Sequence, residues 1–343
     1  MSAPDPRPAS APSTLGRVVA VRRRRTRRTL LTCGVLAAAI LAVFCLSLMV
    51  GRTYYPPSDV LAVLLGQDVP GASFTVGTLR LPRAVLAVLA GACFGLGGVT
   101  FQTMLRNPLA SPDIIGISSG ASAAAAFGIV ILGLSGTAVS LLSIVAGLLV
   151  ALLIYLLSSR GGVAGTRLIL VGIGISAMLT SLTDWVLSMA GQWDLQEALR
   201  WLTGSLNNTS WEQALPVLAA LVVLGPVLLS RSGELRITQL GDDAAQALGV
   251  RTGRTRLVVV VAAVGLIAFV AFLSGPIAAR IVGPGASPLL PAAAVGALLV
   301  LVADLLGQFA TGTRYPVGVV TGVLGAPYLL YLIVRVNRRG SSL

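Results

Sequence analysis

Residues 22–50 read RRRRTRRTLLTCGVLAAAILAVFCLSLMV: six arginines, then an apolar run from Leu30 to Val50. A helix that crosses a bilayer needs about 20 mainly apolar residues, and this run has that length. The apolar part of a secretory signal is shorter, about 7–15 residues, and no cleavage motif follows cleanly here. The run therefore predicts a first transmembrane helix whose arginines hold the N-terminus in the cytoplasm.

The composition of the whole chain agrees with this reading. Of its 343 residues 55% are hydrophobic and only 11% are charged, with a mean hydropathy of +0.90. Soluble domains carry about 25% charged residues, so lipid is the natural solvent of most of this chain. We predict an all-α integral membrane protein, a polytopic helical bundle. Residues 1–28 are expected to be a disordered basic cytoplasmic N-terminus, 29–336 the transmembrane domain and 337–343 a cytoplasmic tail.

Further apolar runs follow the first one along the chain. Together they predict spans near 30–50, 84–104, 114–133, 137–157, 168–190, 212–230, 257–274, 288–309 and 317–335. Between two of them, the segment Gly275-Pro-Ile-Ala-Ala-Arg-Ile-Val-Gly-Pro284 is too short to cross a bilayer.

The charge pattern predicts the sidedness of the chain. The net charge is +13, and every basic residue is an arginine. These arginines lie mainly between apolar runs, which excludes nucleic acid as a partner and is typical of cytoplasmic loops. Both termini are expected in the cytoplasm. Nine spans cannot satisfy that expectation, because an odd number of crossings puts the two ends on opposite sides.

The residues that are missing or isolated exclude most catalytic chemistry. The chain has no histidine, so Ser-His-Asp hydrolysis, His proton relays and His metal sites are excluded. Cys33, Cys45 and Cys93 lie in apolar runs without metal-type spacing. The segment Gly116-Ile-Ser-Ser-Gly120 superficially resembles a serine motif of an intramembrane protease but has no histidine base. We predict no catalytic residue, no metal site and no cofactor.

Three segments stand out from generic membrane sequence. The first joins Arg80-Leu-Pro-Arg83 to QTMLRNPLASPDIIGISSGA at 102–121; its prolines break a helix, which predicts a structured connection that leads into a cavity-lining helix. The second, LGDDAAQALGV at 240–250, predicts a short exposed helix for docking a partner, the alternative being an ordinary solvated loop. The third, YPVGVVTGVLGAPY at 315–328, indicates a tightly packed last span.

Together these segments resemble, over about residues 52–336, the FecCD family of permeases of iron-siderophore and cobalamin ABC importers. The SPDIIG and LGDDAAQALGV segments are most similar to those of ferric-enterobactin permeases. The resemblance implies the type II importer fold with ten spans in the cell (inner) membrane, and a ferric-siderophore substrate of the catecholate, enterobactin-like kind. It also implies a second permease subunit, identical or paralogous, an extracytoplasmic binding protein and two cytoplasmic ATPase subunits. The chain itself has no phosphate-binding loop.

The resemblance also implies roles for individual residues. Arg80 and Arg83 would lie on the outer face and pair with carboxylates of the binding protein, unless they are only membrane-interface anchors. The translocation-path motif comprises Gln102, Arg106, Asn107, Pro108, Pro112, Gly116 and Gly120. Coupling to the ATPase is implied for Gly241, Asp242, Asp243, Ala244, Leu248 and Gly249.

The chain departs from the family pattern at two places. Ala303-Asp304 is followed by Gln308 where the family carries a further arginine, which implies that one docking contact is lost. The stretch after Gly275 is about ten residues shorter than in the family, so the eighth span is shortened. This shortening accounts for the odd number of spans, and we expect it to impair transport.

A secondary transporter driven by ions is the alternative to an ATP-driven importer. Such proteins carry ionisable residues within the membrane as coupling sites. Asp184 and Asp304 are the main candidates in this chain.

Overall fold

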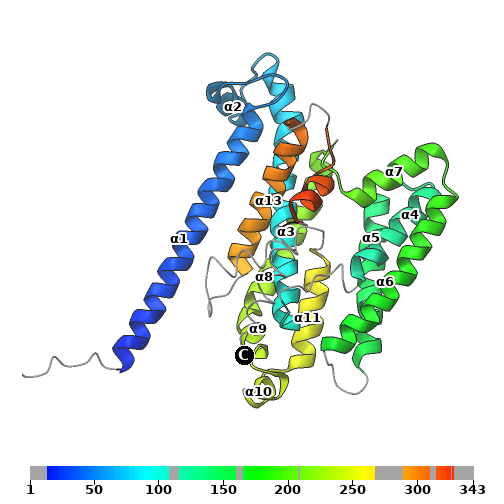
Figure 1. Cartoon of the computed structure of the whole chain (residues 1–343). Helices are drawn as coiled ribbons and strands as arrows, with labels where there is room; N and C mark the ends of the chain where they lie inside the picture. The colour runs from blue at the N-terminus through cyan, green and yellow to red at the C-terminus, as the bar shows by residue number, and fades with distance from the viewer. Residues whose placement is uncertain are drawn as a thin grey trace, which may run out of the picture.

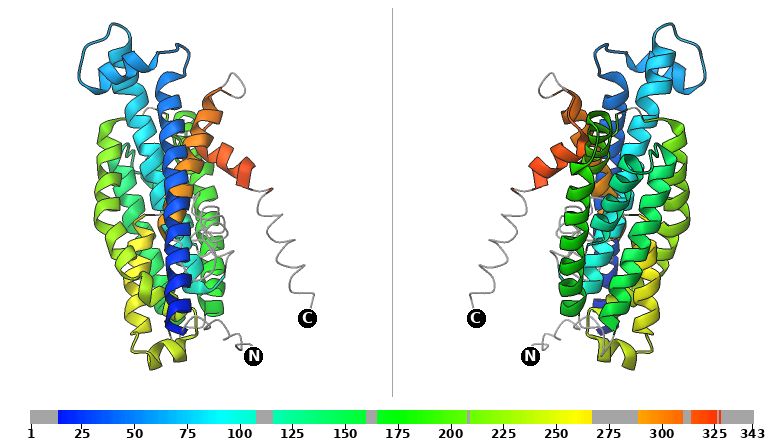
Figure 2. Two further views of the ribbon diagram at one scale, coloured as in Figure 1. Left: turned by 90° about the vertical axis from the view of Figure 1, so that its left-hand side faces the viewer. Right: turned by 90° about the vertical axis from the view of Figure 1, so that its right-hand side faces the viewer.

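A computed structural model describes residues 14–107, 116–159, 165–207, 209–266, 289–309, 314–325 and 327. Every regular element in these ranges is a helix, which confirms the predicted fold class. The helices run roughly parallel to one another, with α1 on one flank of the bundle and α4, α5 and α6 on the other (Figures 1 and 2). Pro108, Pro112, the shortened segment 275–284 and the tail 337–343 lie outside the described residues.

Helix α1 begins much earlier than the sequence predicts. It runs from Thr14 to Met49 without a break, so the expected disorder of residues 1–28 is wrong for 14–28. Arginine is a good helix former, and no glycine or proline interrupts the basic run, so the membrane helix continues past the apolar residues. The 20 residues from Leu30 to Met49 rise about 30 Å, which matches the hydrocarbon core, and the basic part extends beyond it.

Most predicted spans are confirmed as helices, with ends shifted by a few residues. In the described part of the chain, six helical stretches are long and apolar enough to cross a membrane: 19–49, 73–105, 137–158, 167–188, 211–230 and 289–309. The first stretch is part of α1. The other five consist of η1 (Ser73–Arg80, a π-helix) together with α3 (Leu81–Leu105), then α5 (Thr137–Ser159), α6 (Gly165–Ser188), α8 (Trp211–Ser230) and α13 (Leu289–Phe309). Helix α4 (Ile117–Val130) is shorter, α11 covers Thr252–Val264, and residues 317–325 are also helical.

Helix α3 forms the centre of the bundle, packed against α13, α8 and α11. It approaches α13 at backbone distance, because a Cβ at Gly91 or Gly95 would collide with the α13 backbone at Gly296 and Ala292. Small residues at such a crossing allow close van der Waals packing in a membrane. The glycines of α3 therefore allow this close crossing.

Helices α4, α5 and α6 pack together as a second group. Gly116 precedes α4 with a φ of 90°, and a Cβ there would lie 2.7 Å from the carbonyl oxygen of Gly172 in α6. A Cβ at Gly120 would lie 2.6 Å from a methyl of Val150 in α5. Two of the predicted path residues thus hold α4 tightly against its neighbours.

Short elements gather at the two ends of the bundle (Figure 1). At one end, called here the α2 end, lie α2 (Pro57–Leu64), η1 and α7 (Gln192–Thr203). At the other, the α10 end, lie α9 (Ser232–Thr238), α10 (Asp242–Ala247) and the last turn of α3. The sequence predicted a short helix within 240–250, and α10 confirms it; α2 and α7 were not anticipated.

Candidate functional sites at the two ends of the bundle

Asp242 joins two of the predicted motifs at the α10 end. It is the first residue of α10, and its carboxylate accepts a hydrogen bond from Nη2 of Arg106, the residue that ends α3. Nη2 of Arg256, on α11, donates to both carboxylate oxygens at 2.9 and 2.8 Å. One carboxylate thus holds α10, α3 and α11 together by charge-assisted hydrogen bonds.

Arg106 reaches Asp242 from an unusual backbone conformation. Its φ of 53° makes it, among the residues that the structure describes, the one non-glycine residue in the left-handed region. This is the geometry of a helix C-cap, and it turns the chain sharply where α3 ends. Asn107 follows, its N–H donating to the carbonyl oxygen of Gln102, while Gln102 itself is buried in α3. The first part of the path motif, from Gln102 to Arg106, therefore leads from the core to the α10 contact.

The two leucines that flank α10 are exposed. Leu240 and Leu248, on either side of it, are 68% and 63% exposed, whereas Ala245 between them is fully buried. Gly241 and Gly249 enclose the helix with φ values of 116° and 84°, which other residues rarely adopt. Two exposed leucines on a rigidly capped helix are suited to entering a groove on a partner.

Glu234 fastens α9 to α11 beside this contact. Its carboxylate accepts hydrogen bonds from the Thr255 hydroxyl and, at 2.8 Å, from Nη1 of Arg231. The Thr255 bond, helped by Arg231, lowers the pKa of the Glu234 carboxyl below its usual value against the opposing effect of burial. The carboxylate is therefore charged, and α9 and α11 are held together, throughout the physiological pH range.

Arg83 is engaged within the chain at the α2 end. Its guanidinium forms a bidentate pair with Asp304 of α13, with Nη2 2.7 Å from Oδ1 and Nε 2.9 Å from Oδ2. Nη1 donates to Asn207 at 3.0 Å, and Gln308 donates to the same carboxylate at 2.8 Å. The Arg83 and Asp304 side chains are only 13% and 4% exposed. This network ties α3 to α13 and to the connection after α7.

Arg80 is also held by internal partners. Its Nη1 and Nη2 donate to the carbonyl oxygens of Leu48 and Thr53 at 2.8 and 2.7 Å, and its guanidinium lies over the Tyr55 ring. Gly51 lies directly beneath, where a Cβ would collide with the guanidinium. Both arginines lie at the α2 end of the bundle, but each is bound inside the chain, so neither presents a free guanidinium for a partner carboxylate.

Sequence reasoning missed the partners of the predicted residues. The sequence indicates Asp304 only as a possible coupling acid and Gln308 only as the site of a lost arginine, and it gives no specific role to Arg256. One feature of the sequence could have indicated the Arg83–Asp304 pair. An acid within an apolar span, as Asp304 is, needs a charged partner, and Arg83 lies at the end of another span. The distance in sequence, 221 residues, gave no indication of the pairing.

Comparisons with known proteins cover nearly the whole chain. Residues 39–335 match the model of the FecCD transport family. The chain is 36% identical to the ferric enterobactin transport system permease protein FepG of Escherichia coli (strain K12), over 92% of this chain and 98% of that protein. It is 38% identical to the achromobactin transport system permease protein CbrC of Dickeya dadantii (strain 3937), over 86% and 89% of the two chains.

A solved structure shares the fold. It was determined as an inward-facing conformation of a metal-chelate type ABC transporter. The similarity has a TM-score of 0.79 at 26% sequence identity and covers 88% of this chain and 98% of that one.

Proposed function

This chain belongs to the FecCD transport family, and on that premise we propose that it forms the path by which a ferric siderophore enters the cell. It is a membrane-embedded permease of an iron-chelate ABC importer, a transport component and not a catalyst. Permeases of this family work with a second permease subunit, an ATPase and a substrate-binding protein. The features below support particular roles for its two ends.

The Asp242 bridge carries the proposal for the α10 end. An ATPase that binds α10 can act on the core only through a connection that transmits its movement. Asp242 supplies that connection, because it joins α10 directly to Arg106 at the end of the central helix α3. The exposed Leu240 and Leu248 supply the surface for docking. We therefore assign the α10 end to the cytoplasm and to the ATPase.

The α2 end then faces outward and receives the binding protein. The positive-inside rule supports this orientation, since Arg22–Arg28 lie at the opposite end of α1. The internal bonds of Arg80 and Arg83 change the docking expected from the sequence. Arg80 lies over Tyr55, and Arg83 is bonded to Asn207 and Asp304. To pair with a carboxylate of the binding protein, each arginine would first have to leave its internal partners.

The substrate is proposed to be a catecholate siderophore related to ferric enterobactin. The similarity to FepG supports it, over a greater share of both chains than the achromobactin relative. The Fe(3+)-citrate import permease YfmE of Bacillus subtilis (strain 168) is equally similar, at 36% identity. Ferric citrate is therefore the competing substrate that a test must include.

The test is uptake of radioactive iron by cells that lack their own siderophore permeases. The chain is expressed with its neighbouring ATPase and binding-protein genes, and iron is offered as ferric enterobactin or as ferric citrate. We expect ATP-dependent uptake of the enterobactin complex, and its loss when Leu248→Asp removes one docking leucine. Uptake of citrate alone would reject the catecholate, and full uptake by Leu248→Asp would reject α10 as the ATPase contact.

The ion-coupled alternative loses its structural support. Asp304 is paired with Arg83, and Asp184 is exposed on α6, so neither is a buried acid that waits for a coupling ion. Uptake that collapses with an ionophore while ATP is maintained is the result that would favour this alternative.

A further inference from the structure

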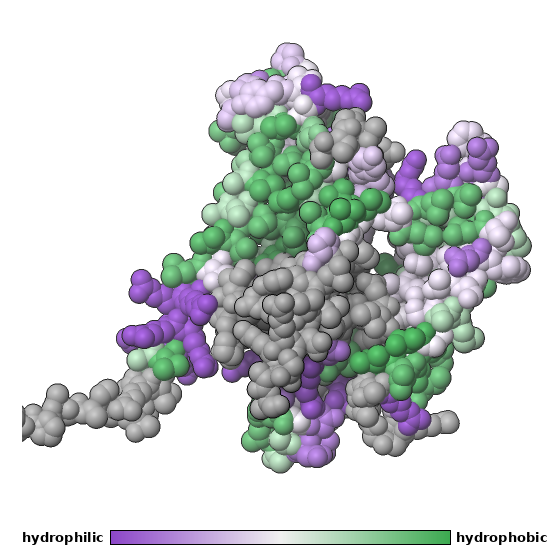
Figure 3. Space-filling model, viewed as in Figure 1, coloured by the Kyte–Doolittle hydropathy of each residue, from purple (hydrophilic) through white to green (hydrophobic). Residues whose placement is uncertain are grey.

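The basic end of α1 is a cationic surface that meets no carboxylate of the residues that the structure describes. Arg22, Arg23, Arg24, Arg25, Arg27 and Arg28 are all exposed. Within the described part of the chain, none of them pairs with a carboxylate. Figure 3 shows this hydrophilic end of α1 immediately below a hydrophobic surface. Clusters of four to eight arginines beside a transmembrane helix attract anionic lipid headgroups.

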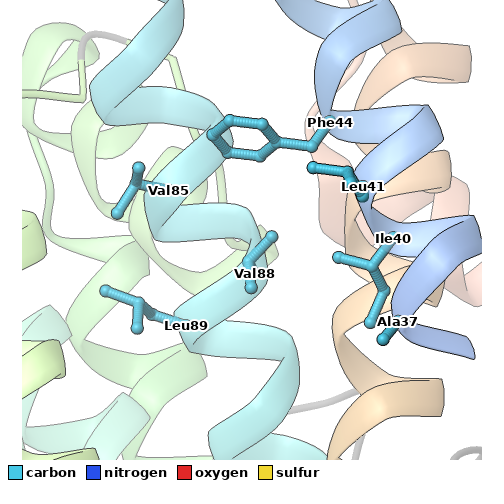
Figure 4. A pocket seen from close by; sticks show the side chains of 7 residues that line it. All are labelled: Ala37, Ile40, Leu41, Phe44, Val85, Val88 and Leu89. Carbon is cyan, nitrogen blue, oxygen red and sulfur yellow. The ribbon is translucent and has the colours of Figure 1, made fainter. Parts of the chain in front are cut away.

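An apolar cavity lies farther along the same helix. It is open to the surface, has a volume of about 320 Å³ and lies between α1 and α3 (Figure 4). Its lining is entirely apolar and comes from these two helices: Ala37, Ile40, Leu41, Phe44, Val85, Val88 and Leu89. Leu41 is 63% exposed at its edge. A cavity of this lining at membrane depth is suited to a hydrocarbon chain and to no polar ligand.

The distance between the two features matches one lipid molecule. If the hydrocarbon core begins at Leu30, where the apolar run begins, its midplane lies about 15 Å along the helix, ten residues farther at Ile40. A lipid whose headgroup lies beside the arginines therefore places the end of its acyl chain among Ala37, Ile40 and Leu41. The headgroup charge and the chain length fit the same molecule.

We propose that α1 binds an anionic phospholipid of the adjacent leaflet, with its phosphate on the arginine run and one acyl chain in the cavity between α1 and α3. The helix geometry assigns the arginines unequally. At 100° per residue, Arg22, Arg23 and Arg27 lie within about 90° of the centre of the cavity-lining face, whereas Arg24, Arg25 and Arg28 lie about 110° or more away. The first three arginines form the headgroup site.

Fluorescence quenching tests both halves of the proposal in the full chain. The variant Leu41→Trp places a fluorophore at the edge of the cavity, and the unmodified chain measures the background from its four native tryptophans. The protein is reconstituted in phosphatidylcholine vesicles, and phosphatidylglycerol or phosphatidylcholine brominated near the end of one acyl chain is added. We expect the phosphatidylglycerol to be preferred about tenfold, because each arginine near the surface favours an anionic lipid.

Two triple variants distinguish a site from diffuse attraction to the membrane. Changing Arg22, Arg23 and Arg27 to Gln should bring the preference close to one. Changing Arg24, Arg25 and Arg28 to Gln removes the same charge from the same helix, with equal helix propensity, and should leave most of the preference. Equal loss in the two variants, equal quenching by both lipids in the Leu41→Trp chain, or quenching no greater than the background would each overturn the proposal.

Discussion

At the scale of single residues, the function of this permease depends on charges that have specific partners. Arg83 and Asp304 form a nearly buried ion pair, and such a pair is costly to break because it leaves one charge without compensation. Asp242 is shared by Arg106 and Arg256 at the opposite end. Each acid joins helices that are far apart in the sequence, so these residues position helices and need no catalytic chemistry.

The Arg83–Asp304 pair should stabilise the fold as a unit. We expect Arg83→Gln or Asp304→Asn alone to cost about 3–5 kcal/mol, because the remaining charge stays buried. The double variant Arg83→Met with Asp304→Leu should recover most of that loss, since an apolar pair of similar size needs no compensation. Thermal unfolding of the purified chain in detergent measures all three. A double variant no more stable than the singles contradicts this account.

The same double variant also tests docking at the α2 end. If Arg83 contributes to binding-protein docking, the variant should fold and yet bind the partner at least tenfold more weakly, because the guanidinium is gone. Unchanged affinity in pull-down titrations would leave Arg83 as a purely internal residue. Glu197→Gln with Arg200→Gln, which removes one exposed acid and one exposed arginine from α7, is the control with the same unchanged net charge.

At the scale of elements, α3 is the helix on which the others depend. It crosses α13 at Gly91 and Gly95, and its C-cap at Arg106 contacts α10. We therefore propose that a movement of α10 is passed through this contact to the helix that forms the centre of the bundle. A transport assay cannot distinguish the binding of the ATPase from the transmission of its movement. In this structure different residues are proposed for the two events: Leu248 for binding and Asp242 for transmission.

Asp242→Asn should separate those two events. The substitution keeps the shape of α10 and the exposed Leu248, but it replaces two ion pairs with weaker hydrogen bonds from the same arginines to a neutral amide. We expect the ATPase still to co-purify with the permease, while its stimulation by substrate-loaded binding protein falls at least fivefold. Leu248→Asp should instead lose co-purification. Identical defects in the two variants would show that Asp242 acts in docking alone.

The close crossing of α3 and α13 permits a direct test. A Cβ at Gly95 meets backbone atoms of α13, which cannot move aside as a side chain does. We expect Gly95→Ala to destabilise the chain by about 1–3 kcal/mol, the usual cost of overpacking. Gly174→Ala on α6 is the control, since no atom lies within 4 Å of a Cβ there and helix propensity improves. Equal unfolding temperatures for the two variants would contradict this packing.

At the scale of the whole molecule, we propose different tasks for the two ends of the bundle, and the basic end of α1 predicts which side of the membrane each end faces. Labelling of single cysteines in intact cells checks this orientation after Cys33, Cys45 and Cys93 are replaced by serine or alanine. A membrane-impermeant maleimide should label Asp68→Cys beside α2 and should reach Gln239→Cys beside α10 only after the cells are opened. The reverse pattern would invert the proposed orientation. The predicted effect of the shortened 275–284 segment stays a prediction.

The sequence determined the class, the family and most helix positions, because these follow from local properties. Apolar runs of span length and the motifs at 80–83 and 240–250 can be recognised residue by residue. It misjudged residues 14–28, since a Pro- and Ser-rich beginning suggested disorder where arginine continues the helix. Only the tertiary structure decided the partners. Charges pair by distance in space, and folding brought Arg83 to Asp304 and Arg106 to Asp242 across 221 and 136 residues of sequence.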